Sequence, residues 1–250
     1  MKKEFDSAER TKPIKHLVIH SFALTPAKML DTLHQYGLSV HYMIDSKGKV
    51  YRLVPEERVT WHAGASFWAG EAGLNQTSIG IELEHLDYGQ TDYPAIQVQA
   101  LIKLAKEIIA RHKIRSENIV GHSDIAPIAK MDPGQGFPWK KLAAKGIGLW
   151  YDLGNSKKIP SLNVNQLLSI IGYDVQGGIN AVCWAFRKRF MPETVPYDKD
   201  IAKKEKEVFA ARQKNMPTPP IYPPDLDLTD PDFIKVLRAT AYQYQQARSK

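Results

Sequence analysis

The sequence of 250 residues contains a single cysteine, Cys183. One cysteine cannot form an internal disulfide, so the fold must be stable without cross-links. Its apolar neighbours Val182, Trp184 and Phe186 favour a small buried side chain over a nucleophile. Long apolar runs are missing as well, since no stretch approaches the roughly 18 apolar residues that a membrane-spanning helix needs. The sequence therefore predicts no membrane span.

The chain also lacks a concentrated block of charge. Its net charge of +7 and pI of about 9.3 favour acidic partners such as nucleic acid or an anionic cell surface. The densest basic stretches are 187–189 and 203–206, and the second is interleaved with acids, which is typical of a solvated helix face. No basic stripe interleaved with aromatic residues is present in the sequence. We therefore expect no nucleic-acid partner.

An apolar stretch near the N-terminus is missing too. Lys2 and Lys3 are followed by Glu4, Phe5 and Asp6, where a signal peptide needs its apolar segment. No export signal is visible in this sequence. On this ground alone, we expect either a protein that stays in the cytoplasm or a mature or trimmed form.

What the sequence does contain is an alternation of short β-rich runs with helical runs over residues 16–127, which is typical of a mixed α/β domain. Strands are expected at 17–22, 40–45, 50–54, 78–84 and 118–122, and helices at 26–36, 94–112 and 139–144. The composition shifts after Trp150, and 154–158 read as a linker. Further helices are expected at 163–171, at 179–190 and from Asp230 to about residue 246, with an extended proline-rich stretch at 217–224. The predicted fold class is α/β, a mixed central sheet flanked by helices, followed by a small all-α C-terminal module.

Two histidines lie where a strand ends or opens into a loop. His20 ends an apolar strand, and His122 leaves another strand in a segment whose prolines favour turns. A loop can bring Asp124 or Asp132 back beside His122. Two imidazoles and one carboxylate, with a fourth position left to water, form the kind of ligand set that a catalytic zinc uses. Spacing does not choose between the two aspartates, and the alternative is that Asp124 orients His122 while Asp132 caps a turn.

Paired acids occur in the predicted strand 78–84. The period of two places the carboxylates of Glu82 and Glu84 on one face and the neighbouring aliphatic side chains on the other. Acids that face a cleft can supply a general base. Exposed acids on an edge strand are the commoner arrangement, and the pattern alone does not exclude it.

Four motifs follow one another in order: VIH at 18–20, TWHAG at 60–64, NQTSIGIELE at 75–84 and GHSDIAPIAKMDPG at 121–134. Together they resemble the zinc-dependent N-acetylmuramoyl-L-alanine amidases of the type 2 branch, relatives of phage amidases and of peptidoglycan recognition proteins. The resemblance covers residues 14–152. It implies one zinc ion per chain, held by His20, His122 and Asp132. It also implies that Glu82 is the general acid/base and Lys130 the cationic stabiliser of the oxyanion.

The resemblance further implies a substrate and a groove. The bond expected to be cut is the amide between N-acetylmuramic acid and the L-alanine of the stem peptide, so the expected partners are peptidoglycan or muropeptides. Trp61, His62 and Asn75 match positions near the substrate groove, although His62 can instead hold a loop in place. The rival interpretation is a peptidoglycan recognition protein that binds without cutting. Such binders typically lose a zinc ligand, whereas all three are present here.

The C-terminal residues resemble a second family more faintly. Stretches 165–173 and 181–191 are similar to the first two helices of a three-helix peptidoglycan-binding module, with the core of its motif at Ala185, Phe186, Arg189 and Phe190. Residues 192–230 take the place of a short connection, and a purely structural or oligomer-forming role is the alternative. This resemblance implies domains at 1–153 and 159–250. It also favours the periplasm or cell envelope as the location, against the absence of a visible signal.

Overall fold

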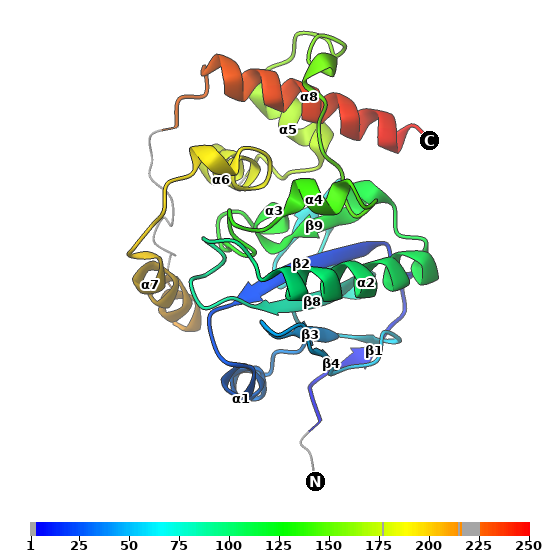
Figure 1. The fold of residues 1–250 in the computed structure, drawn as a ribbon, viewed down its shortest axis with the longest axis vertical. Helices are drawn as coiled ribbons and strands as arrows, with labels where there is room; N and C mark the ends of the chain where they lie inside the picture. The colour runs from blue at the N-terminus through cyan, green and yellow to red at the C-terminus, as the bar shows by residue number, and fades with distance from the viewer. Residues whose placement is uncertain (1–3, 177, 215, 217–225) are drawn as a thin grey trace.

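A computed structural model of the chain describes residues 4–176, 178–214, 216 and 226–250 (Figure 1). A central sheet lies between helices, and the helices α5, α6 and α8 stack at one end of the molecule (Figure 1). The stretch 217–224, which we predicted to be extended, lies outside the described residues. No helix in the described ranges combines the length and the apolar character needed to cross a membrane.

The main sheet has five strands in the order β4-β3-β8-β2-β9. Strands β3, β8, β2 and β9 run parallel to one another, and β4 pairs with β3 as an antiparallel hairpin. The bounds are β2 (His16–Phe22), β3 (Tyr42–Ile44), β4 (Val50–Arg52), β8 (Ser78–Glu84) and β9 (Ile119–Gly121). Two small antiparallel pairs accompany this sheet: β1 (Ala8–Glu9) with β5 (Arg58–Val59), and β6 (Phe67–Trp68) with β7 (Glu71–Ala72).

The predicted helices are confirmed to within one or two residues at their ends. They are α1 (Pro26–Tyr36), α2 (Ala95–His112), α4 (Trp139–Ala143), α5 (Val164–Ile171), α6 (Ile179–Phe190) and α8 (Pro231–Arg248), with a further α3 (His122–Ile125) and α7 (Ile201–Gln213). Asp230 caps α8 as predicted, because its carboxylate accepts a hydrogen bond from the Asp232 amide. The predicted strand 118–122 is shorter, since His122 already begins α3. The charged stretch 203–206 lies on α7, where Lys203 is exposed.

The two faces of the sheet differ in chemistry. Leu17, Ile19, Ile79 and Ile81 point to one face, where they pack with α2 in one hydrophobic cluster. Alternate residues of the same strands point to the other face. Because β2 and β8 pair with His20 beside Glu82, these two polar side chains share that second face. The period of two thus separates the core from the candidate site.

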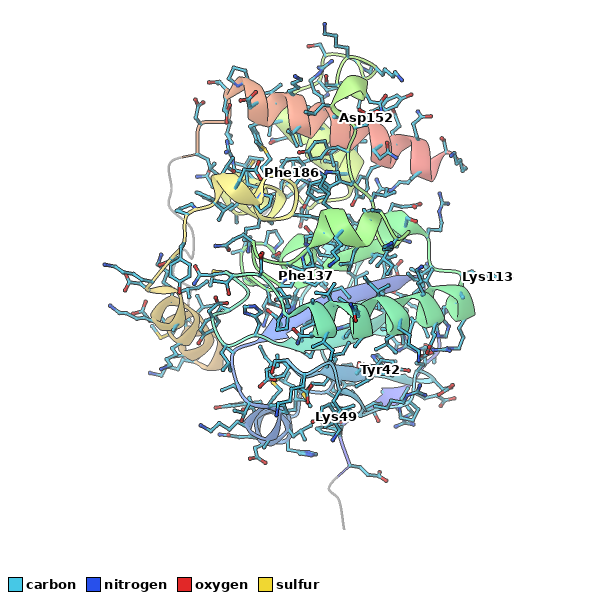
Figure 2. All side chains as sticks on the ribbon, viewed as in Figure 1. Tyr42, Lys49, Lys113, Phe137, Asp152 and Phe186 are labelled. Atoms are coloured by element: carbon cyan, nitrogen blue, oxygen red, sulfur yellow. The ribbon has the colours of Figure 1, made fainter. Side chains whose placement is uncertain are left out.

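The second face is covered largely by the C-terminal helices. A single hydrophobic cluster joins Val18 and Val120 of the sheet with Phe186 of α6 and Tyr244 of α8. Figure 2 labels Phe186 on α6. Cys183 is fully buried in the same cluster, as predicted. This cluster spans the predicted boundary between 1–153 and 159–250, and the division into two domains stays a prediction.

Candidate metal centre

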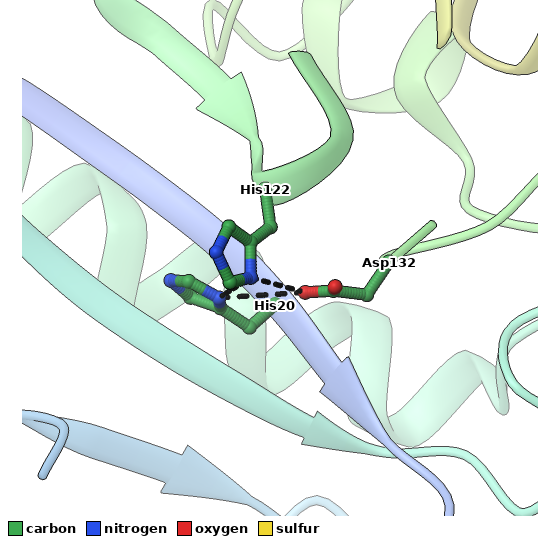
Figure 3. Close-up of side chains that lie close together, drawn as sticks. All are labelled: His20, His122 and Asp132. Atoms are coloured by element: carbon green, nitrogen blue, oxygen red, sulfur yellow. Dashed lines mark hydrogen bonds and ion pairs between the residues drawn. The ribbon is translucent and has the colours of Figure 1, made fainter. Parts of the chain in front are cut away.

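Three side chains that are distant in the sequence converge beside the second face of the sheet. His20 lies on β2, His122 is the first residue of α3 directly after β9, and Asp132 lies in the loop beyond α3 (Figure 3). Nδ1 of His20 is 2.9 Å from Nδ1 of His122. Oδ2 of Asp132 lies 3.1 Å from the His122 nitrogen and 3.4 Å from the His20 nitrogen. These are the three residues that the amidase resemblance implies as ligands.

The spacing of the three atoms fits a zinc ion. Ligand atoms about 2.0–2.1 Å from zinc at tetrahedral angles lie roughly 3.3 Å from one another. The three distances of 2.9, 3.1 and 3.4 Å bracket that value. Two imidazole nitrogens and one carboxylate oxygen are also ligands that zinc prefers, and three protein ligands leave a fourth position open.

The orientation of His20 is fixed by a chain of hydrogen bonds behind it. The Ser78 hydroxyl donates to the Leu74 carbonyl at 2.6 Å, so its oxygen accepts the hydrogen bond of 3.1 Å from Nε2 of His62. Nδ1 of the neutral His62 ring then accepts from Nε2 of His20 at 2.8 Å. A proton on Nε2 of a neutral His20 leaves the lone pair of Nδ1 facing His122 and Asp132. The hydrogen-bond pattern therefore presents the correct nitrogen to a metal.

His62 is buried by this arrangement and is only 9% exposed. Its ring lies over Gly80, where an added Cβ would come within 2.6 Å of Nδ1 of His62, so only glycine leaves room for the ring. Burial, together with the neighbouring His20 and His41 rings, holds the pKa of His62 well below its usual range, which keeps the ring neutral. Both ring nitrogens are engaged within the protein. In this structure His62 therefore supports His20, and a substrate contact by His62 stays a prediction.

The electrostatics around the other two ligands favour metal binding. Burial lowers the pKa of His122 to about 3, so its ring is neutral near pH 7. Burial by itself would raise the pKa of Asp132, but His122 and His20 hold it well below the usual range. A neutral imidazole and an ionised carboxylate are the protonation states that bind zinc.

Glu82 pairs with His20 across β2 and β8, and Lys130 lies two residues before Asp132 in the sequence. Oε2 of Glu82 is buried and has no hydrogen-bond partner among the described residues. Burial raises the pKa of Glu82 to about 7, while the charges of His20 and Lys130 oppose the shift and that of Asp132 adds to it. A carboxyl group with a pKa near 7 is suited to accept and return a proton. Glu84 is occupied differently, because its Oε2 accepts a hydrogen bond from the Ser46 amide at 2.8 Å.

The loop that carries Asp132 is held by backbone contacts. The Asp132 carbonyl accepts a hydrogen bond of 2.8 Å from the Ser123 amide, which ties the loop to the residue after His122. The Tyr93 hydroxyl donates to the Pro133 carbonyl at 2.6 Å. Gly134 follows with a φ of 84° and packs so closely on the 88–89 backbone that a side chain would clash there.

Asp124 does not point at the ligand cluster, so the alternative in which it replaces Asp132 is not supported. Its Oδ1 accepts from the Tyr173 hydroxyl at 2.7 Å, and its Oδ2 accepts from the Gly121 amide at 2.8 Å and from Nη1 of Arg189. Sequence reasoning missed the Tyr173 and Arg189 partners. Only the Gly121-to-Asp124 spacing of three residues, typical of a capped helix start, signals that this carboxylate serves the backbone.

The remaining two predicted site residues lie around the 61–75 region. The Asn75 amide oxygen accepts a hydrogen bond of 2.8 Å from the Ala63 amide, and it thereby fixes the segment that follows His62. The Trp61 backbone donates to the Ser39 hydroxyl at 2.9 Å, and its side chain is partly exposed. A substrate contact by either side chain stays a prediction.

The geometry agrees with what comparison with known proteins finds. Residues 10–135 match the family model described as N-acetylmuramoyl-L-alanine amidase. The chain belongs to this amidase family. A curated member, the N-acetylmuramoyl-L-alanine amidase AmiD of Escherichia coli K12, is 40% identical over 208 residues, which cover 72% of this chain and 75% of the relative.

Solved structures extend the similarity to nearly the whole chain. The complex of E. coli AmiD with the substrate anhydro-N-acetylmuramic acid-L-Ala-D-γ-Glu-L-Lys matches with a TM-score of 0.73 and 32% identity, covering 98% of this chain and 94% of that one. AmpDh3 from Pseudomonas aeruginosa in complex with anhydromuramic pentapeptide matches with a TM-score of 0.70 and 30% identity, covering 96% and 97%. These matches confirm the predicted mixed α/β fold of an amidase, including its C-terminal helix.

Proposed function

We propose that this amidase is zinc-dependent and hydrolyses the amide bond between N-acetylmuramic acid and the L-alanine of the stem peptide. The observation that carries the proposal is the convergence of two imidazole nitrogens and a carboxylate oxygen, within 4.8 Å of one another, together with the buried Oε2 atom of Glu82 on the same face of the sheet. His20, His122 and Asp132 would hold the metal. When bound, zinc would supply Lewis-acid chemistry, activating water and polarising the carbonyl of the substrate.

Glu82 provides the proton transfers in this proposal. Its carboxylate takes a proton from the attacking water and returns it to the leaving nitrogen of the peptide. Its raised pKa of about 7 means that neither protonation state is strongly favoured near neutral pH. The buried and unpartnered Oε2 atom is free of competing hydrogen bonds from the described residues.

Lys130 provides the positive charge for the developing oxyanion. It lies two residues before Asp132, and its charge reaches both Glu82 and His122, since it contributes to the pKa shifts of both groups. Comparable donors contribute about 3 to 4 kcal/mol to transition-state stabilisation. The carboxylates of Asp132 and Glu82 offset part of the local positive charge.

The substrate proposed is peptidoglycan or its muropeptide fragments, the anhydro forms included. The two solved amidases named above are complexes with anhydromuramyl peptides, which supports this class of ligand. Incubating the enzyme with sacculi and with soluble anhydromuropeptides, side by side, and analysing the products by mass spectrometry tests the choice. Release of free stem peptides from neither substrate would contradict the proposal.

Glu82→Gln tests the mechanism directly. We expect the variant to bind one zinc ion like the unmodified protein, because Glu82 is not among the proposed ligands, and to lose about 10²- to 10⁴-fold in turnover of muropeptides. Glu84→Gln is the matched control on the same strand and should retain turnover.

Zinc content is measured by elemental analysis after dialysis, and removal of zinc with a chelator should abolish activity. Full turnover in Glu82→Gln, or in metal-free protein, would refute the proposed roles.

The periplasm or cell envelope is the proposed location. It rests on the resemblance of stretches 165–173 and 181–191 to an envelope-associated module. Fractionation of cells that express the protein from its native gene, followed by immunodetection, tests this. Recovery of all the protein with cytoplasmic markers would contradict it.

A further inference from the structure

The densest basic stretch of the sequence is buried rather than displayed. Arg187, Lys188 and Arg189, on the last part of α6, are 7%, 5% and 2% exposed. Long cationic side chains are rarely buried unless they are paired. α6 contacts both α3 and α4, so it lies against the segment that begins with His122 (Figure 1). The partners of these three side chains therefore indicate what the stretch does.

Lys188 reaches the loop of one proposed ligand. Its Nζ donates a hydrogen bond of 2.7 Å to the carbonyl of Met131, the residue directly before Asp132. The next carbonyl, that of Asp132 itself, accepts from the Ser123 amide at 2.8 Å. Two consecutive peptide groups of this loop are thus held, one by the C-terminal helix and one by the segment after His122.

Arg189 contacts the segment around His122, the second proposed ligand that α6 approaches. Its guanidinium forms a buried ion pair with Asp124, two residues after His122, and donates a hydrogen bond of 2.9 Å to the carbonyl of Ile119 in β9. The group also lies 4.0 Å from the ring centre of Trp139. The Tyr173 hydroxyl, from just beyond α5, completes the contacts of Asp124.

Arg187 differs from its two neighbours, although it is equally covered. It pairs with Asp230 at 3.0 Å and stacks on the ring of Phe233, both belonging to the start of α8. These two contacts therefore lie within the C-terminal helices. Arg187 stabilises those helices and provides a comparison for residues that reach the metal centre.

We propose that Lys188 and Arg189 are positioning residues for the metal centre, with α6 holding the two segments that present His122 and Asp132. The inference rests on the proposed function, because it assumes that these residues bind zinc. A ligand atom displaced by a fraction of an ångström weakens a metal site, and loss of a polar group that orients a ligand typically lowers metal affinity by about 10- to 100-fold. The helices after residue 159 are then part of the active site and more than an attached module.

The test compares Lys188→Met and Arg189→Lys with Arg187→Met in the full-length chain. Lys188→Met keeps the length and apolar stem of the side chain and removes its donor, while Arg189→Lys keeps the charge and removes the forked geometry. Zinc affinity is measured by competition with a chromophoric chelator, ligand geometry by the visible absorption spectrum of the cobalt(II)-substituted protein, and global stability by thermal unfolding.

We expect Lys188→Met and Arg189→Lys to bind zinc about 10- to 100-fold more weakly and to change the cobalt spectrum. Arg187→Met should lower the unfolding temperature yet leave the zinc affinity within about twofold of the unmodified protein. If Arg189→Lys does not fold, the zinc affinity and cobalt spectrum of Lys188→Met decide whether α6 positions the metal centre. Unchanged zinc affinity and spectrum in Lys188→Met overturn the positioning role alone. An unmodified protein that binds no zinc overturns the proposed function as well.

Discussion

At the scale of single residues, the most informative side chain is one that lies behind a proposed zinc ligand. His62 accepts from His20 and donates to Ser78, so it determines which nitrogen of His20 faces the centre. A neutral imidazole is suited to this because it offers one acceptor and one donor on opposite sides of a ring. Gly80 supplies the space that the ring occupies.

Substitution of His62 tests this relay. We expect His62→Leu, which removes both hydrogen bonds, to weaken zinc binding by about 10- to 100-fold, the usual cost of losing an outer partner of a ligand. His62→Gln keeps one acceptor and one donor and should lose less than about tenfold. Chelator competition measures both, and His34→Leu on α1, whose ring stacks on Phe5, is the control. Zinc affinity in His62→Leu equal to that of the unmodified protein would exclude the relay.

The sequence pattern alone could not decide which carboxylates belong to the site. Period two placed Glu82 and Glu84 on one face, but the resemblance, not the pattern, singled out Glu82. Likewise, the resemblance and not the spacing singled out Asp132 over Asp124. The structural reason is that Asp124 is neutralised by Arg189, which lies 65 residues further along the chain. No local spacing encodes so distant a partner.

At the scale of elements, a polar cluster ties the loop after β4 to the end of α2. The Glu56 carboxylate accepts hydrogen bonds from Tyr42 of β3 and from Arg111 and His112 of α2. Burial by itself would raise the pKa of Glu56, but the hydrogen bonds from these three side chains lower it to about 2. The cluster therefore stabilises the fold chiefly while Glu56 is ionised.

This cluster predicts a defined pH dependence of stability. Because the folded pKa lies below the ordinary value of 4.5, the stabilisation is fully present above about pH 4.5 and is lost as the pH falls toward 2. Glu56→Gln should lower the free energy of unfolding by about 2 kcal/mol at pH 7, discounted because Arg111 is half exposed. The difference should shrink below pH 4.5 in urea titrations. Glu57→Gln, on an exposed neighbour, should show neither effect, and a constant difference at all pH values would contradict the assignment.

Most elements could be predicted because their signals are local. Hydrophobic periodicity and caps such as Asp230 mark the strands and helices, and these depend on neighbours within a few residues. The break between β9 and α3 was missed, because a helix that begins at His122 has only four residues and leaves no periodic pattern. Strand order was equally beyond reach, since it depends on contacts between distant segments.

At the scale of the whole molecule, the hydrophobic cluster that includes Val18, Val120 and Phe186 joins the sheet to the C-terminal helices. We expect one cooperative unfolding transition, with equal calorimetric and van't Hoff enthalpies in metal-free protein, instead of two separate transitions. Phe186→Ala should lower the free energy of unfolding by about 3 to 5 kcal/mol and move the whole transition. Leu86→Ala, at a side chain that is 66% exposed, is the control. A split transition in calorimetry would show that the two predicted domains unfold independently.

The burial of the basic stretch on α6 also bears on the charge that the protein exposes to solvent. The formal charge of +7 includes Arg187, Lys188 and Arg189, none of which is more than 7% exposed. Counterions and polyanions meet the accessible charges far more than the covered ones. The described residues also cover five carboxylates, those of Asp45, Glu56, Glu84, Glu117 and Asp124. Retention on a cation-exchange column should therefore be no weaker than the isoelectric point suggests.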